Sequence, residues 1–254
     1  MSQQERAART QNALIRSAAE LFERHGYEKA SLNEISSGAG VSRGALHFHF
    51  DTKAEVARAV ESAAVRALRD AVDSLPLGDA SALQDLTDLS HRLVQLLLWD
   101  VVVRAGFMLS CEAGQRTRVD LCQEWQTYVH GLVARAADEK ALAPGVSQNG
   151  VVNVVVATTV GLAVLSRSDK AWLTGQTLTS FWKVLLPSVA DPRTAAALNP
   201  SGTGWARAGL LARQPRSAPP AEGCPGPSAT PDPVHESARR PPESRHVCSA
   251  GESF

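Results

Sequence analysis

The chain has 254 residues, 44% of them hydrophobic, which is enough for one large or two small domains with a packed core. Its 26 Lys and Arg balance its 26 Asp and Glu, and a neutral total neither requires nor excludes a polyanionic partner. The first residues are polar and lack the apolar run of a signal peptide. The most apolar stretch, residues 151–165, is too short to span a bilayer and contains Asn153. We therefore expect a soluble, cytoplasmic protein that does not enter a membrane.

The first predicted element is a helix over about residues 4–25, because apolar residues recur there at helical spacing from Leu14 to Phe22. Gly26 stands where a left-handed residue ends a helix, and Tyr27 is the apolar contact expected after it. The helix would therefore present one apolar stripe to a core and end in a sharp turn.

Two short helices are predicted next. Ser31 and Glu34 form a capping box that starts the first of them, and Gly40 can take the left-handed turn at its end. Ser42 caps the second. Two helices joined by a short turn with Gly form a helix-turn-helix, in which the N-terminal residues of the second helix contact base edges in the major groove.

Those N-terminal residues are Ser42, Arg43 and Gly44. Arg43 has the chemistry for a bidentate contact to guanine, and the small Gly44 lets the helix approach the bases. His47 and His49 follow as further candidate DNA contacts. Phe48 and Phe50 are expected to anchor the same helix to the core.

Two cations outside this helix are candidate phosphate contacts. Lys53 starts the next helix, after a second capping box of Thr52 and Glu55, where its charge and the free backbone amides favour a phosphate. Arg9, near the N-terminus, is expected to reach the DNA backbone. Residues 1–58 carry eight Lys or Arg against seven Asp or Glu, so charge alone leaves open a generic three-helix module with ordinary surface charges.

The remainder of the chain divides into a helical region and a tail. Strand signals are almost absent, so we expect an all-α fold. Residues 191–254 hold 11 of the 14 prolines and are predicted to be disordered. The expected domains are 1–51 (helix-turn-helix), 52–190 (helical) and 191–254 (Pro-rich tail). The expected helices of the second domain span 52–74, 79–98, 100–113, 118–140, 147–168 and 172–190.

The second domain carries candidate ligand contacts. Trp125 and Tyr128 lie on one stripe of a predicted helix, and each brings a large ring with one polar hydrogen. Thr159 interrupts an aliphatic helix, so its hydroxyl either faces a cavity or bonds back to its own helix. The last two helices are apolar over much of their circumference, which predicts burial in a homodimer interface.

Signatures of enzymes are missing from the sequence. It has no GxSxG, no GxGxxG after a strand and no Walker loop. His47 and His49 lie two apart on a helix, so they cannot chelate one metal. We therefore expect no enzymatic activity, no cofactor and no metal site.

The segment EISSGAGVSRGALHFHFDTKAEV resembles the DNA-binding region of the TetR family of bacterial repressors. The resemblance implies a homodimer on palindromic double-stranded operator DNA and a helical C-terminal domain that holds a small effector. His47 departs from the family pattern, which has a phosphate-contacting Tyr there. Imidazole reaches less far and can titrate near neutral pH, so either the contact is weaker or operator affinity gains a pH dependence.

A narrower resemblance links the chain to actinomycete γ-butyrolactone receptors, through GALHFHF, VVVRAGFMLS and QEW. It implies that Trp125 lines the ligand pocket. Phe107, in the second motif, is a further candidate ligand contact, in a position that reads more apolar than the family's usual Arg-containing pair. Pseudo-receptors, which respond to antibiotics or their intermediates, share these features.

The resulting hypothesis is a ligand-responsive repressor of secondary-metabolism genes. Two alternatives remain: a helical ligand- or protein-binding module without DNA binding, and a constitutive repressor without a ligand. A filled cavity around Trp125 would mark the second alternative.

Overall fold

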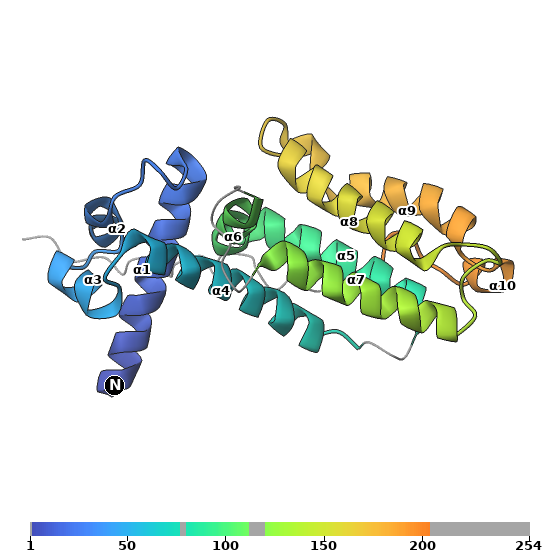
Figure 1. Ribbon diagram of the computed structural model, residues 1–254, viewed down its shortest axis with the longest axis horizontal. Helices are drawn as coiled ribbons and strands as arrows, with labels where there is room; N and C mark the ends of the chain where they lie inside the picture. The colour runs from blue at the N-terminus through green and yellow to red at the C-terminus, as the bar shows by residue number, and fades with distance from the viewer. Residues whose placement is uncertain (1, 77–79, 112–119, 204–254) are drawn as a thin grey trace, which may run out of the picture. The chain divides into compact units, whose positions relative to one another are not determined.

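The computed structural model describes residues 2–76, 80–111 and 120–203. Helices make up most of these ranges, with one isolated bridge between Leu142 and Ala190 and no strand among the described residues, which confirms the expected all-α fold. The elements are α1 (Gln3–His25), α2 (Leu32–Gly38), α3 (Arg43–His49), α4 (Lys53–Asp73), α5 (Ala82–Trp99), α6 (Val101–Cys111), α7 (Leu121–Asp138), α8 (Gln148–Leu165), the 3₁₀ turn η1 (Lys170–Trp172), α9 (Gly175–Val189) and α10 (Pro192–Ala195) (Figure 1).

Local side-chain chemistry sets the starts of the N-terminal helices. The Ser31 hydroxyl accepts from the Glu34 amide, and the Glu34 carboxylate accepts from the Ser31 amide, which is the predicted capping box. Ser42 caps α3 through the Ala45 amide at 3.1 Å. At α4, Thr52 caps as predicted, but the Glu55 carboxylate accepts from the amide of Asp51 instead of Thr52.

The turn after α1 differs from the predicted left-handed one. Gly26 has φ 78° and ψ 161°, an extended conformation with positive φ that is essentially restricted to glycine. Tyr27 still packs back on α1, with its ring centroid 5.6 Å from that of Phe22. Gly40 takes a positive φ of 68°, as the turn between α2 and α3 requires.

A first hydrophobic core joins α1, α2 and α3 to parts of two later helices. Its fully buried centre includes Leu14, Ile35 and Leu46, one from each of these three helices. The core continues past the expected domain boundary at residue 51. It takes in Val56, Ala57 and Val60 of α4 and Val101, Ala105 and Leu109 of α6.

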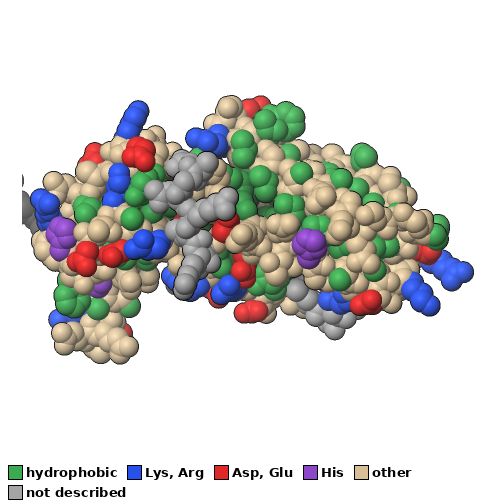
Figure 2. Space-filling view, in the orientation of Figure 1, with side chains coloured by type: hydrophobic (Ala, Val, Ile, Leu, Met, Phe, Trp, Pro, Cys, Tyr) green, Lys and Arg blue, Asp and Glu red, His purple; other side chains and the backbone are tan. Residues whose placement is uncertain are grey.

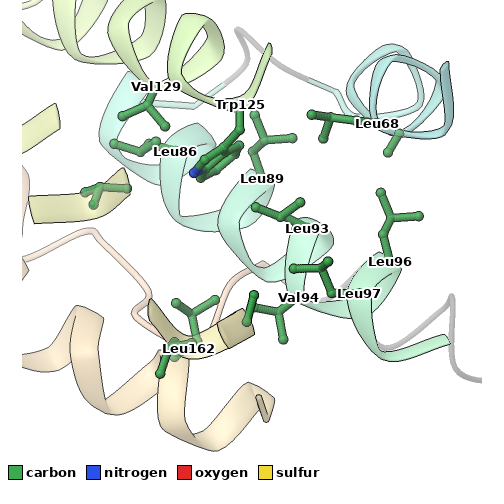
Figure 3. Close-up of a cluster of buried hydrophobic side chains, with 14 of the residues drawn as sticks. Leu68, Leu86, Leu89, Leu93, Val94, Leu96, Leu97, Trp125, Val129 and Leu162 are labelled. Atoms are coloured by element: carbon green, nitrogen blue, oxygen red, sulfur yellow. The ribbon is translucent and has the colours of Figure 1, made fainter. Parts of the chain in front are cut away.

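A second hydrophobic core is built by α4 to α9. Trp125 of α7 lies at its centre, 2% exposed, and points toward the leucines of α5 (Figure 3). Helices α7 and α8 pack against each other, and α5 contacts both, so α5 is the central helix of this domain. A helix surrounded in this way is buried on several sides, and α5 buries polar as well as apolar residues along its length.

The disordered tail is predicted to begin at residue 191, which is too early in the chain. Residues 191–203 are ordered, because buried polar groups of α5 hold them. The Gln84 side chain accepts from the Asn199 amide at 2.7 Å, and the Asp88 carboxylate accepts from the Thr203 amide at 2.8 Å. His91 contacts the Pro200 carbonyl at 3.0 Å, and burial lowers its pKa. The prediction for 204–254 lies outside the described residues.

Candidate DNA-binding face and ligand cavity

One side of α3 is exposed and carries most of the predicted DNA contacts. Ser42, Arg43, Gly44 and His47 are all exposed there. Arg43 and His47 lie one turn apart, with Arg43 Nε 3.4 Å from His47 Nε2. Leu46, on the opposite side, is fully buried and fixes α3 on the core. The fold therefore presents Arg43 to solvent at the N-terminal end of a short, firmly anchored helix.

Phe48 does not anchor the helix as predicted. Its side chain is 80% exposed, whereas Phe50 is buried. The reason is helical geometry: position 48 lies two residues after Leu46 in α3, which rotates it about 200° away from the buried side, whereas Phe50 follows the helix in an extended conformation. Phe48 therefore belongs to the exposed face, where an apolar ring can contact a thymine methyl. The sequence signal that indicates this is the spacing from Leu46.

The two remaining candidates of this region occupy different surroundings. His49 is half-buried, with its ring centroid 5.2 Å from that of Phe48 in an edge-to-face arrangement. Arg9 is exposed within α1, in its second turn. Both stay predictions as DNA contacts.

Lys53 has a structural role that its position at a helix start did not indicate. Its Nζ donates to the backbone carbonyls of Tyr27 and Glu28, 3.0 Å from each oxygen, and lies 4.5 Å from the centroid of the Tyr27 ring. The ammonium group has three donors, so one remains for a phosphate. Lys53 thus ties the start of α4 to the loop between α1 and α2.

Replacing Lys53 with Met should lower the free energy of unfolding by about 1–2 kcal/mol, because two hydrogen bonds to carbonyls and the contact with the Tyr27 ring are lost. Urea denaturation measures this loss. The slope of log affinity for DNA against log salt should fall by about 0.9 for each phosphate that Lys53 contacts. Lys29→Met, at an exposed position, is the control. Wild-type stability of Lys53→Met would contradict the structural role.

Trp125 and Thr159, both predicted as ligand contacts, bond to each other. Trp125 Nε1 donates to Thr159 Oγ1 at 2.8 Å in the buried core, and the Thr159 hydroxyl donates to the Val155 carbonyl at 2.9 Å. The Thr159 hydroxyl therefore bonds back to its own helix, as one of the two expected options had it, and also accepts from the tryptophan. Every polar hydrogen of the pair is satisfied without a ligand.

The cavity beside this pair is nearly filled. It measures about 10 Å³, at most the room needed by one water molecule. Phe107 lines it with Leu97, Cys122, Trp125, Thr159 and three further apolar side chains. Leu97 and Phe107 also line a neighbouring open cavity of about 430 Å³, so these two side chains are shared by a small cavity and a large one.

Tyr128 does not line either cavity. It is half-buried on α7 beside Glu124, and burial, followed by the Glu124 charge, raises its pKa. Glu124 itself accepts from Arg69 of α4 at 2.7 and 3.0 Å, which lowers the pKa of the carboxyl group. Tyr128 therefore packs at the edge of the core that contains Trp125, beside the polar contact between α4 and α7.

Exposed apolar side chains gather on the last two long helices. Val154, Val164 and Leu165 of α8 and Val184 of α9 are 42–75% exposed, and Figure 2 shows hydrophobic side chains at the surface over these helices. Only a third of α8 is buried, although by length and composition this helix is apolar enough to cross a membrane, as core helices of soluble proteins also are. The single chain therefore leaves part of the expected interface uncovered.

The comparisons with known proteins agree with this architecture. The family model for bacterial regulatory proteins of the tetR family matches residues 14–60, from within α1 to the first part of α4. The A-factor receptor protein of Streptomyces griseus is 28% identical over 80% of this chain and 71% of its own length. Residues 14–60 thus match the DNA-binding region of the TetR family, and most of the chain is similar to a receptor protein.

Solved structures show more narrowly which regulators the chain resembles. A crystal structure of a γ-butyrolactone receptor, described as ArpA-like, matches with a TM-score of 0.67 at 28% identity, over 76% of this chain and 94% of that one. CprB from Streptomyces coelicolor, in complex with its operator sequence, matches with a TM-score of 0.65 at 28% identity over the same shares. The protein is thus a DNA-binding regulator related to the γ-butyrolactone receptors. These relatives are regulators and receptors, which confirms the expectation that it is not an enzyme.

Proposed function

We propose that the protein is a homodimeric repressor that acts in the cytoplasm, binds a palindromic operator through α3 and releases it when a small molecule binds the second domain. The observation that supports this proposal most directly is the exposed face of α3, in a chain whose fold matches that of γ-butyrolactone receptors. Arg43 reads a guanine, while Ser42, Gly44 and His47 bring α3 close to the duplex. The proposed domains are 1–51 for DNA reading and 52–190 for effector binding and dimerisation.

Dimerisation is supported by the uncovered apolar side chains of α8 and α9. Val184, 75% exposed, and Val154, 45% exposed, are costly to leave in water and gain by pairing with a second copy. Two copies of each helix would form a four-helix interface. Such a dimer has a twofold axis, which matches two half-sites of a palindromic operator.

The proposed effector is a γ-butyrolactone-like molecule or an antibiotic intermediate, bound beside Trp125 and Thr159. The controlled genes would be those of secondary metabolism. Because the cavity there is nearly filled, the effector must select a conformation in which Leu97 and Phe107 move toward the open cavity. The second candidate function is a constitutive repressor without this effector, and the filled cavity favours it.

Fluorescence anisotropy of the protein on DNA from upstream of its own gene tests the proposal. We expect tight, salt-sensitive binding by two chains per operator, and release by γ-butyrolactones or by solvent extract of the producing culture. Release by extract alone would identify a metabolite-sensing pseudo-receptor. Binding that no lactone or extract reverses would favour the constitutive repressor, and absence of binding at low salt would contradict DNA recognition.

Trp125→Phe tests the effector pocket without emptying it. The phenyl ring keeps most of the apolar volume but lacks the N–H that bonds to Thr159. The free energy of unfolding should therefore fall by about 1–2 kcal/mol. We expect unchanged DNA affinity and an effector response weakened about tenfold, measured as the effector concentration that releases half of the DNA. Tyr128→Phe, which leaves the cavity lining intact, is the matched control. An unaltered response of Trp125→Phe would remove Trp125 from the pocket.

A further inference from the structure

The open cavity of about 430 Å³ combines an apolar wall with a cationic rim. Arg104, Arg167 and Lys170 line it, together with one carboxylate, that of Glu23, and with Ser166 and Ser168. Its other lining side chains are apolar: Leu97, Phe107, Met108, Ala163 and Leu173. Its volume lies in the range of small-molecule sites. An apolar wall with an excess of positive charge is complementary to a molecule that has a hydrocarbon part and an acid group.

Arg104 already holds a carboxylate in the geometry that such a ligand needs. Its Nε and Nη2 donate to the two oxygens of Glu23, at 2.6 and 3.2 Å. Its Nη1 donates to the carbonyls of Leu97 and Leu98, at 3.3 and 2.9 Å, at the C-terminal end of α5. The guanidinium is therefore fixed by the body of the protein, and one edge is offered to a carboxylate as a bidentate pair.

The other two cations have no competing partner. Arg167 and Lys170 are exposed, and neither makes an ion pair or a side-chain hydrogen bond within the described residues. Arg167 follows the end of α8, next to the buried Ser166, and Lys170 is the first residue of η1. Because these two side chains are not used in polar contacts within the described residues, they are available to bind an anion.

We propose that this cavity binds an amphipathic carboxylate. Its acid group takes the place of Glu23 on Arg104 and lies within reach of Arg167 and Lys170. Its hydrocarbon chain lies along Leu97 and Phe107, which also line the small cavity beside Trp125. This site is distinct from the Trp125–Thr159 pair, and the positive charge of its rim selects for an anionic ligand.

Occupation of the site has a consequence for DNA binding, and this step rests on the proposed function. Glu23 belongs to α1 and Arg104 to α6, so their ion pair ties the DNA-reading helices to the second domain. A carboxylate on Arg104 releases Glu23 and favours conformations in which the ion pair between α1 and α6 is broken, while their hydrophobic contact remains. The ligand therefore shifts the population away from the form in which that tie is made.

Isothermal titration calorimetry of the full chain with sodium decanoate, without DNA, tests the site. We expect saturable binding of decanoate and about tenfold weaker binding of decan-1-ol, which has the same chain and no charge. Arg167→Ala/Lys170→Ala should weaken decanoate binding about tenfold. Arg66→Ala/Arg193→Ala, which removes two exposed cations elsewhere, should not. Equal affinity for acid and alcohol, or full affinity in the Arg167/Lys170 variant, overturns the site.

Glu23→Gln tests the exchange on Arg104. Without the competing charge, decanoate should bind about fivefold more tightly, and a variant that binds decanoate no better than wild type overturns the exchange. Anisotropy on upstream DNA then tests the regulatory step. Decanoate that binds in the calorimeter but leaves bound DNA in place overturns that step alone. If the wild type binds no DNA, the proposed function fails while the calorimetry still decides the cavity.

Discussion

Arg43→Ala is expected to weaken binding to the specific operator by about 30-fold to 10⁴-fold. A bidentate arginine–guanine contact contributes about 1–3 kcal/mol of discrimination, and a dimer on a palindrome loses two such contacts. Arg43 is exposed, and its guanidinium bonds to the exposed His47 ring at 3.4 Å, so the fold should keep its stability. Anisotropy on the operator and on a random duplex of equal length measures the loss.

The random duplex separates base reading from general charge. Arg43→Ala should lose far more affinity for the operator than for random DNA, because phosphate contacts act on all sequences alike. Arg43→Lys restores the charge without the planar fork, so we expect only partial recovery. Arg193→Ala, an exposed arginine of α10, is the control for net charge. Equal losses on both duplexes would show that Arg43 reads no base.

Short-range chemistry explains why much of the N-terminal unit could be predicted from the sequence. A capping box connects residues three apart, so Ser31 and Glu34 mark the start of α2 without any tertiary information. Ser42 marks the start of α3 in the same way. The positive φ of Gly40 follows from the tight turn between these helices. These local signals also place Arg43 at the exposed end of α3.

The contacts that the sequence did not indicate depend on partners far away in the chain. Lys53 bonds to carbonyls 25 and 26 residues before it, which no local pattern contains. Trp125 and Thr159 each suggest a pocket, but only the fold shows that they satisfy each other across 34 residues. Residues 191–203 read as tail by composition, yet Asn199 and Thr203 are held by α5, 115 residues earlier.

Gly106→Ala is expected to destabilise the fold by about 2–3 kcal/mol, although alanine favours helices. Helix α6 crosses α4 at this glycine, and a Cβ there would lie 2.4 Å from the Cβ of Ala64. A methyl group on a helix cannot swing aside, so α4 and α6 must separate, and overpacking of this kind costs about 1–3 kcal/mol. Urea denaturation measures the change as a lower midpoint at constant slope.

Two matched variants decide whether this close approach is the cause. Gly131, inside α7, has open space where its Cβ would be, so Gly131→Ala should stabilise the protein by about 0.5–1 kcal/mol. Ala64→Gly combined with Gly106→Ala moves the methyl group across the contact and should recover part of the loss, less the cost of about 1 kcal/mol for glycine inside α4. If Gly106→Ala is as stable as wild type, the helices tolerate the methyl group. If it is less stable and binds the operator more weakly, the spacing of α4 and α6 also sets how α1 and α3 meet DNA.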